Sequence, residues 1–397
     1  MKPEELRGGM TPLSWFALLF VLSVAFNVHR LGGAALGPGF ETTAVARALA
    51  KGQGFSNPFE VAPTGPTAHL APVYPALLGG ILMVFGETAR AASLVLGLEL
   101  FLQAMVVALL PGISKSLFGD RKPGVIGAIL MIVLPVTPLK PAFEPSLTAL
   151  LLIVVVAAAI HKRMWLCGGL LGALGLTNPA AILAAVPIAL HSLGRRGTAL
   201  ALLLGSLVCS PWIIRNYMVL GAWIPIRDNF GLELSLANDD CAGVETGTNS
   251  CLGLTYPRTN RAVALELASV GEAAYSARRG RQAERWIAAH PKRFFDLTAA
   301  RIGLFWFPHE SIAISAITAI GFLGLWLARG TPAFGPLIGS MCAFSLPYYV
   351  VSGELRRRQP IMWMTALVAG YAITQGILYL HPRILASVGR VEERKAI

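Results

Sequence analysis

The feature that most constrains this chain is a series of apolar stretches, most of them about as long as a helix that crosses a lipid bilayer. A hydrocarbon core of about 30 Å, crossed at about 1.5 Å per residue, requires roughly 20 apolar residues. Two stretches, 164–177 and 180–193, are shorter and form a predicted hairpin. The predicted spans are 12–28, 91–113, 124–139, 146–160, 164–177, 180–193, 198–214, 311–328, 333–351 and 361–380. The sequence therefore predicts an all-α polytopic membrane protein with about ten transmembrane helices.

The composition excludes two other classes of protein. Only 14% of the residues are charged and 55% are hydrophobic, whereas a soluble domain carries about 25% charged residues. The net charge of +12 would suggest nucleic-acid binding in a soluble protein. Here most basic residues lie in short loops between apolar stretches, where anionic head groups and the positive-inside rule account for them. Neither a soluble enzyme nor a nucleic-acid-binding protein is indicated.

The loop charges predict the orientation of the helices. The stretch 72–85 contains two prolines and two glycines, which favours an interfacial or re-entrant helix over a span. When this stretch is left out of the count, the main basic clusters fall on the side of the N-terminus, which the positive-inside rule assigns to the cytoplasm. These clusters are Lys115/Arg121/Lys122, His161/Lys162/Arg163, Arg195/Arg196 and Arg329. Both termini are then expected in the cytoplasm.

This topology divides the chain into three parts. Residues 1–214 form a transmembrane core that includes a first outer loop, 30–90, with juxtamembrane helices. Residues 215–310 form a small helical extracytoplasmic region. Residues 311–397 form the last transmembrane helices and a short cytoplasmic tail.

Two cysteines share one loop of the extracytoplasmic region. Cys241 and Cys251 would lie in an oxidising compartment, where a disulfide persists. A disulfide is therefore predicted, with two unpaired thiols as the alternative. No Cys/His spacing in the chain suggests a zinc site.

Two glutamates are predicted at the outer membrane surface, where a charged group is costly unless it has a function. Glu41 opens a short predicted helix in the first outer loop, and Glu144 lies at the outer mouth between spans 124–139 and 146–160. Both also fit a structural role, because the helix dipole favours a carboxylate in the first turn of a helix. The sequence alone leaves both interpretations open.

Arginines lie on the same outer face, against the positive-inside rule. Arg356, Arg357 and Arg358 stand at the outer start of the last span, and Arg90 stands at the outer start of span 91–113. Arginine clusters are suited to binding phosphate, whereas anchoring to lipid head groups is the alternative. Because successive helix residues point about 100° apart, the three cannot all face one site. We expect Arg356 and Arg358 to do so.

Several short motifs occur in an order that is similar to a known family. They are ARALAKGQGF at 46–55, GPTAHLAPVYPALLGGILMVFG at 65–86, SPWIIRNY at 210–217, NFGLEL at 229–234 and RRRQP at 356–360. Together with Glu41 and Glu144, this order resembles the integral-membrane GT-C glycosyltransferases, in the clan of protein O-mannosyltransferases and aminoarabinose transferases. The resemblance covers most of residues 10–380 and is to bacterial members.

The resemblance implies a glycosyltransferase of the bacterial inner (plasma) membrane. Such an enzyme moves a sugar from a polyprenyl-phosphate donor to a lipid, glycan or protein acceptor on the extracytoplasmic face. Glu41 is then the catalytic base for the acceptor hydroxyl, and Glu144 is the second acidic site. The implied ligands of the lipid phosphate are Arg90, Arg356, Arg357 and Arg358. Further candidates for contacts with substrate are His69, Tyr74, Arg215, Asn216, Asn229 and Glu233.

No cofactor is predicted, and two other functions stay open. A divalent metal is kept as an alternative but is not indicated, because Phe40 rather than a second acidic residue precedes Glu41. A lipid or solute transporter, or a flippase, is one alternative, but it would be expected to show inverted repeats and broken helices in matching halves. We find neither. A catalytically inactive scaffold of the same fold is the other, and it would not explain outward arginines beside an outward carboxylate.

Overall fold

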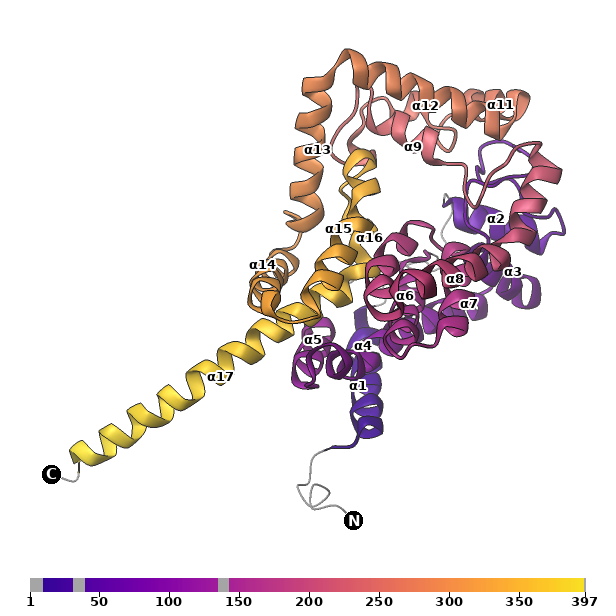
Figure 1. Ribbon diagram of the computed structural model, residues 1–397. Coiled ribbons are helices and arrows are strands. Elements are labelled where there is room, and N and C mark those ends of the chain that lie inside the picture. The colour runs from indigo at the N-terminus through magenta and orange to yellow at the C-terminus, as the bar shows by residue number, and fades with distance from the viewer. Residues whose placement is uncertain (1–9, 31–39, 135–142, 396–397) are drawn as a thin grey trace.

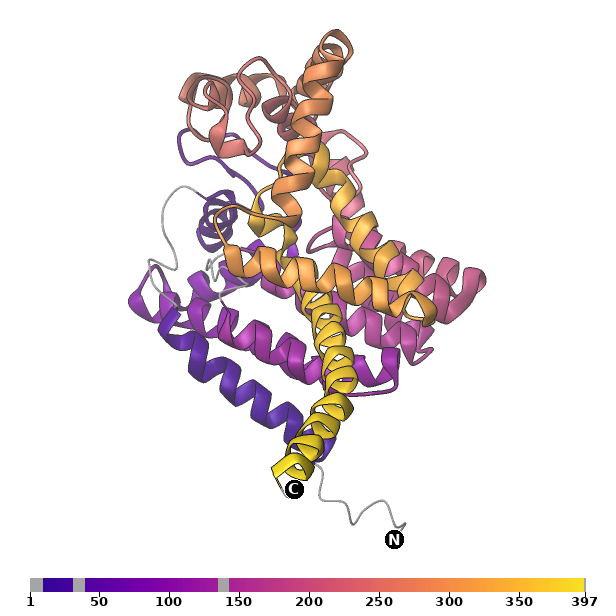
Figure 2. The same cartoon turned by 90° about the vertical axis from the view of Figure 1, so that its left-hand side faces the viewer.

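The computed structural model describes residues 10–30, 40–134 and 143–395, and its regular elements are helices. The end of predicted span 124–139 and part of the first outer loop, 31–39, lie outside the described residues. The apolar helices form one bundle (Figures 1 and 2). They are α1 (Pro12–Asn27), α4 (Ala89–Phe118), α5 (Lys122–Val133), α6 (Pro145–Ile160), α7 (Met164–Gly175), α8 (Ala180–Leu220), α14 (Ile312–Leu327), α15 (Phe334–Val351) and α17 (Met362–Lys395). The predicted all-α class is confirmed for the described residues.

The number of helices long enough to span a membrane is smaller than predicted. Among the described residues, six stretches are long and apolar enough: Pro12–Arg30, Ala89–Phe118, Ala180–Leu220, Ile312–Gly330, Phe334–Val351 and Leu355–Tyr379. The predicted spans 124–139, 146–160 and 164–177 correspond to the shorter apolar helices α5, α6 and α7. The count of ten is therefore not confirmed.

Two further predicted spans, 180–193 and 198–214, both lie in α8, which bends at Gly194. The φ and ψ angles of Gly194 are 70° and 174°, a conformation that is open almost only to glycine. The part of α8 after the bend packs closely on α7. A Cβ atom added at Gly172 would lie 2.5 Å from the Cβ of Val208. Small residues thus bring these two helices together, as they do in membrane proteins generally.

The first turns of the last helix, α17, lie inside the bundle, whereas its C-terminal part projects beyond the other helices (Figure 1). Its residues Trp363 and Leu367 have no exposed surface. It packs against α5 and α14 (Figure 1). A Cβ atom added at Gly324 of α14 would lie 1.9 Å from the carbonyl oxygen of Val368 in α17. The backbones therefore touch at this crossing, and glycine is required there.

The stretch 72–85, which we predict to be interfacial, forms α3 (Val73–Phe85). This helix has 13 residues and is not among those long enough to span. It packs against α2 (Glu41–Ala50) and the start of α4, where Tyr74 and Leu78 are buried against Ala46. The first outer loop is thereby attached to the bundle.

A layer of short helices covers one end of the bundle, at the top of Figure 1. It consists of α9 (Phe230–Ala237), α10 (Leu252–Thr255), α11 (Arg261–Val270) and α12 (Glu272–Ala289). The next helix, α13 (Pro291–Trp306), runs from this layer down to α14 (Figure 1). Its core contains Phe59 from the first outer loop beside Leu232, Tyr256 and Tyr275. The two outer regions therefore fold together as one layer.

Two charged side chains, the buried Glu272 and the half-buried Arg215, hold the first outer loop in place. Glu272, the first residue of α12, accepts hydrogen bonds from the Thr67 hydroxyl and, at 2.6 Å, from the Ala68 N–H. Arg215, near the end of α8, donates to the carbonyl oxygens of Thr67 at 2.7 Å and Phe55 at 2.9 Å. Burial raises the pKa of Glu272 to about 7, although these hydrogen bonds and Arg215 act in the opposite direction.

The raised pKa of Glu272 makes stability depend on pH. Its folded-state pKa of about 7 exceeds the ordinary value of 4.5, so its contribution is fully present below the lower value and is lost as the pH rises through the higher one. We expect the temperature of the thermal midpoint of the purified protein to decrease as the pH rises from about 5 to about 8. In Glu272→Gln, whose side chain resembles the protonated acid, the midpoint should decrease less. Glu266→Gln, on the exposed surface of α11, is the matched control. If the thermal midpoint depended equally on pH in Glu272→Gln and in the parent protein, the raised pKa would not belong to Glu272.

Candidate active site

A cavity of about 180 Å³ lies where the outer layer meets the bundle, and we call it the outer cavity. It gathers side chains from the first outer loop, from the start of α6, from the second outer region and from α16 (Leu355–Arg358). Four carboxylates and four arginines line it: Glu41, Glu144, Glu233, Glu354, Arg227, Arg258, Arg356 and Arg357. Both glutamates predicted from the sequence therefore face the same cavity.

Glu41 is the first residue of α2, and its side chain faces partners from the second outer region. The hydroxyl of Tyr256 donates a hydrogen bond to Oε1 of Glu41. The Nε of Arg258 lies 3.9 Å from the same oxygen. Both of these contacts go to Oε1 and orient the carboxylate.

Glu144 precedes the first residue of α6 and faces Arg227. Its Oε1 lies 3.7 Å from a guanidinium nitrogen of Arg227. Arg227 also donates from Nε to the carbonyl oxygen of His69 at 3.3 Å. The rings of Phe40 and Phe143 pack edge to face at 4.7 Å, which joins the segments that carry the two glutamates. Glu144 therefore holds an arginine at the cavity and does not itself contact Glu41.

The three consecutive arginines divide in a way that differs from our expectation. Arg356 pairs with Glu354, and Arg357 lies 3.4 Å from Glu233; both arginines line the outer cavity. Arg358 has no exposed surface and donates to the Trp306 carbonyl oxygen at 2.8 Å. The pair that faces the cavity is therefore Arg356 and Arg357, and the structure does not place Arg358 there.

Arg358 instead anchors α16 inside the bundle. Besides Trp306, its guanidinium donates to the Thr318 hydroxyl of α14 at 2.7 Å and to the Thr365 hydroxyl of α17 at 3.2 Å. The guanidinium also lies over the Trp306 ring, 4.8 Å from its centre. One side chain thus joins four helices. Arg90, the other predicted phosphate ligand, is exposed on α4 and does not line the cavity.

Of the six further residues predicted to contact substrate, three line the outer cavity and three lie outside it. His69, Asn229 and Glu233 line the outer cavity. Burial lowers the pKa of the His69 imidazole, although Glu41 and Glu233 act in the opposite direction. Tyr74 donates to Glu99 away from the cavity. Arg215 and Asn216 bind backbone carbonyl oxygens and hold loops in place.

Sequence reasoning did not assign Tyr256, Arg258 and Arg227, which are the partners of the two glutamates. Tyr256 and Arg258 lie in the connection between α10 and α11. Such a connection has no hydrophobic period from which the direction of a side chain could be predicted. Arg227 stands two residues before Asn229, and its position beside that candidate is the only signal that could have found it.

The disulfide predicted from the sequence is present in the structure. Cys241 and Cys251 are bonded, with their Cα atoms 5.6 Å apart. The closed loop carries Thr246 and Gly247, which line the outer cavity. The cross-link therefore restricts the motion of one wall of the cavity.

Among its described residues, the outer cavity shows no set of ligands for a divalent metal ion. Hard cations are bound by several oxygen ligands that converge on one point. Among the described residues, no group of three or more His, Cys, Asp or Glu is placed to hold an ion. Each carboxylate of the cavity faces an arginine instead.

Solved structures of an archaeal enzyme share this fold. The Archaeoglobus fulgidus oligosaccharyltransferase tethered with an acceptor peptide containing the NVT sequon gives a TM-score of 0.59 at 13% identity, over 94% of this chain and 50% of that chain. The same protein in complex with Zn and sulfate gives a TM-score of 0.58 at 14% identity, over 95% of this chain and 51% of that chain. Its complex with an inhibitory peptide and a dolichol-phosphate gives a TM-score of 0.55 at 14% identity, over 95% of this chain and 52% of that chain.

The likeness extends to the fold and to about half of the length of these relatives. No family model matches the sequence, and no curated protein matches it. The chain therefore has the GT-C fold that the motifs led us to expect. Membership of the clan of O-mannosyl and aminoarabinose transferases stays a prediction.

Arg356 and Arg358 are expected to respond differently to the same substitution. Arg358→Lys removes donors from buried acceptors, and each such acceptor costs about 1–3 kcal/mol when it is left without a partner. Arg356→Lys changes a side chain that is 34% exposed and should leave stability nearly unchanged. Thermal unfolding in detergent, followed by loss of monodisperse protein, measures the difference. A lower midpoint for Arg356→Lys than for Arg358→Lys would show that the two roles are exchanged.

Proposed function

We propose that this chain is a membrane glycosyltransferase that moves a sugar from a polyprenyl-phosphate donor to an acceptor hydroxyl in the outer cavity. The observation that carries the proposal is the convergence of Glu41 with Arg356 and Arg357 on one cavity. A base and a phosphate-binding pair are the two elements that this reaction needs. The cavity lies at the extracytoplasmic face in the predicted topology, with both termini in the cytoplasm.

In the proposed reaction Glu41 accepts the proton of the acceptor hydroxyl on Oε2. The hydroxyl oxygen forms a bond to the anomeric carbon with inversion, while the bond from that carbon to the phosphate oxygen breaks. Tyr256 and Arg258 hold Oε1 and so orient the carboxylate. General base catalysis of this kind typically contributes about 10²–10⁴ in rate.

The departing lipid phosphate takes up negative charge, which Arg356 and Arg357 are placed to stabilise. The Nε of Arg357 is buried, and no described residue accepts its hydrogen bond. A guanidinium has five donors, so pairing with a carboxylate leaves others for a phosphate. The hydrogen bonds from these donors to the phosphate strengthen as negative charge develops on the leaving group. Glu144 acts as a positioning residue, because it orients Arg227 rather than touching Glu41.

Replacing the proposed base tests the activity. Glu41→Gln keeps the size of the side chain but cannot accept a proton, so we expect turnover to fall by about 10²–10⁴. The measurement uses nanodiscs supplied with a panel of radiolabelled polyprenyl-phosphate sugars and follows which label moves and to what. Glu87→Gln, an exposed glutamate of the same outer loop, is the control and should keep parental turnover. Parental turnover in Glu41→Gln would leave Glu41 as a helix-start residue only.

The arginines are tested by a scan with Ala and Lys. Removing one preorganised donor to a developing charge costs about 2–4 kcal/mol, so Arg356→Ala and Arg357→Ala should lose about 10²–10³ in kcat. Lys should restore only part of the loss, because it lacks the planar fork of arginine. Arg90→Ala is the control and should stay within about twofold of the parent. If Arg356→Ala and Arg357→Ala stayed as close to the parent as Arg90→Ala, the phosphate assignment would be wrong and the transporter interpretation would gain support.

A further inference from the structure

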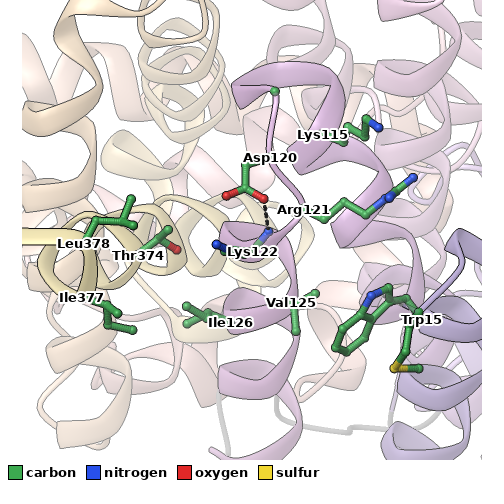
Figure 3. A pocket seen from close by; sticks show the side chains of 12 residues that line it. Trp15, Lys115, Asp120, Arg121, Lys122, Val125, Ile126, Thr374, Ile377 and Leu378 are labelled. Atoms are coloured by element: carbon green, nitrogen blue, oxygen red, sulfur yellow. Dashed lines mark hydrogen bonds between the residues drawn. The ribbon is translucent and has the colours of Figure 1, made fainter. Parts of the chain in front are cut away.

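Two cavities lie side by side at the start of α1 and the end of α4, on the side that the sequence assigns to the cytoplasm. The first, of about 490 Å³, is bounded by α1, the start of α5 and α17 (Figure 3). The second, of about 540 Å³, lies between α1 and α4 and reaches His161. Both volumes fall in the range of about 300–1,000 Å³ that is typical of ligand pockets. The two cavities share the side chains of Trp15, Lys115 and Arg121.

The shared wall is cationic, and the outer walls are apolar. Lys115, Arg121 and Lys122 all line the first cavity, and Asp120 is the one acidic residue among its described lining residues. The Asp120 carboxylate accepts a hydrogen bond from the backbone N–H of Lys122 at 3.1 Å (Figure 3). Among the described residues, no carboxylate is paired with Lys115 or Arg121. Positive charge is thus concentrated between two apolar spaces.

The apolar walls begin directly beside these charges. Ile126, Ile377 and Leu378 line the first cavity, and Phe16 and Leu109 line the second. Gly112 also lines the second cavity, and a Cβ atom added there would meet nothing within 4 Å. Each cavity therefore offers an apolar space that opens next to a shared cationic wall.

We propose that the two cavities bind one anionic diacyl phospholipid of the cytoplasmic leaflet. Its phosphate lies against Lys115 and Arg121, and one acyl chain enters each cavity. The charge favours an anionic lipid over a zwitterionic one, because a choline group would place a fourth cation beside Lys115, Arg121 and Lys122. Trp15 stands between the chains at the depth where interfacial tryptophans lie. The site is independent of the outer cavity and of the proposed activity.

Generic attraction of a basic loop to anionic lipid is the competing explanation, and the chain offers a control for it. Arg195 and Arg196 form another basic cluster on the same predicted side, but they line neither of these cavities. Gly97 lies on α4 like Gly112, and a Cβ atom added there also meets nothing within 4 Å, yet it lies outside both cavities. Arg195 and Arg196 therefore serve as the charge control for Lys115 and Arg121, and Gly97 serves as the control on the same helix for Gly112.

The experiment uses the full chain in nanodiscs that contain equal amounts of phosphatidylglycerol and phosphatidylcholine with identical acyl chains. Native mass spectrometry after release into detergent counts the retained lipids. We expect one retained phosphatidylglycerol per protein, preferred over phosphatidylcholine by about tenfold. The double variant Lys115→Gln/Arg121→Gln should lose this preference. Gly112→Leu, which fills the second cavity but leaves the charges, should reduce retention by about tenfold.

The control variants should keep the retained lipid. These are Arg195→Gln/Arg196→Gln and Gly97→Leu. Equal retention of the two phospholipids by the parent protein would overturn the proposal. So would an equal loss in the Arg195→Gln/Arg196→Gln control, which would indicate generic attraction. Full retention by both Gly112→Leu and Lys115→Gln/Arg121→Gln would place the lipid elsewhere.

Discussion

The segment from Phe55 to His69 is held between two side chains of opposite charge, the half-buried Arg215 and the buried Glu272, and the outer cavity depends on these contacts. Arg215 binds its carbonyl oxygens from the bundle, and Glu272 binds Thr67 and Ala68 from the outer layer. Buried ions that are fully hydrogen-bonded fix geometry more than they add stability. The clamp places His69 at the cavity, and Arg227 is in turn bound to the His69 carbonyl oxygen. The two outer regions are thereby fixed relative to each other.

Charge is balanced pair by pair around the cavity. The four carboxylate side chains are between 14% and 20% exposed, so water screens these pairs less than it screens pairs on the surface. Such pairing keeps each arginine extended and oriented before a substrate arrives. A site of fixed dipoles and charges needs little reorganisation when a negative leaving group forms.

The sequence predicted which residues line the outer cavity better than it predicted the contacts that these residues make. Counting spans was sufficient to place Glu41, Glu144 and the arginine cluster on one face, because topology depends only on hydropathy and loop charge. Whether Arg357 or Arg358 faces the cavity depends on the rotation of α16, and three identical residues carry no information about it. The predicted number of ten spans is not confirmed, because six stretches of the described residues are long and apolar enough. Short apolar helices such as α5 and α7 have the composition of a span, and only packing at glycines such as Gly172 determines their arrangement.

The order of the site residues along the chain has a consequence for biosynthesis. Tyr256 lies 215 residues after Glu41, and Arg356 and Arg357 come just before the last helix, α17. Ribosomes add about 5–20 residues per second, so a nascent chain carries Glu41 for about ten seconds or more before its partners are translated. Under the proposed activity, a nascent chain that carries Glu41 alone lacks the groups that complete the outer cavity, and it cannot transfer sugar before Arg356 and Arg357 have been added.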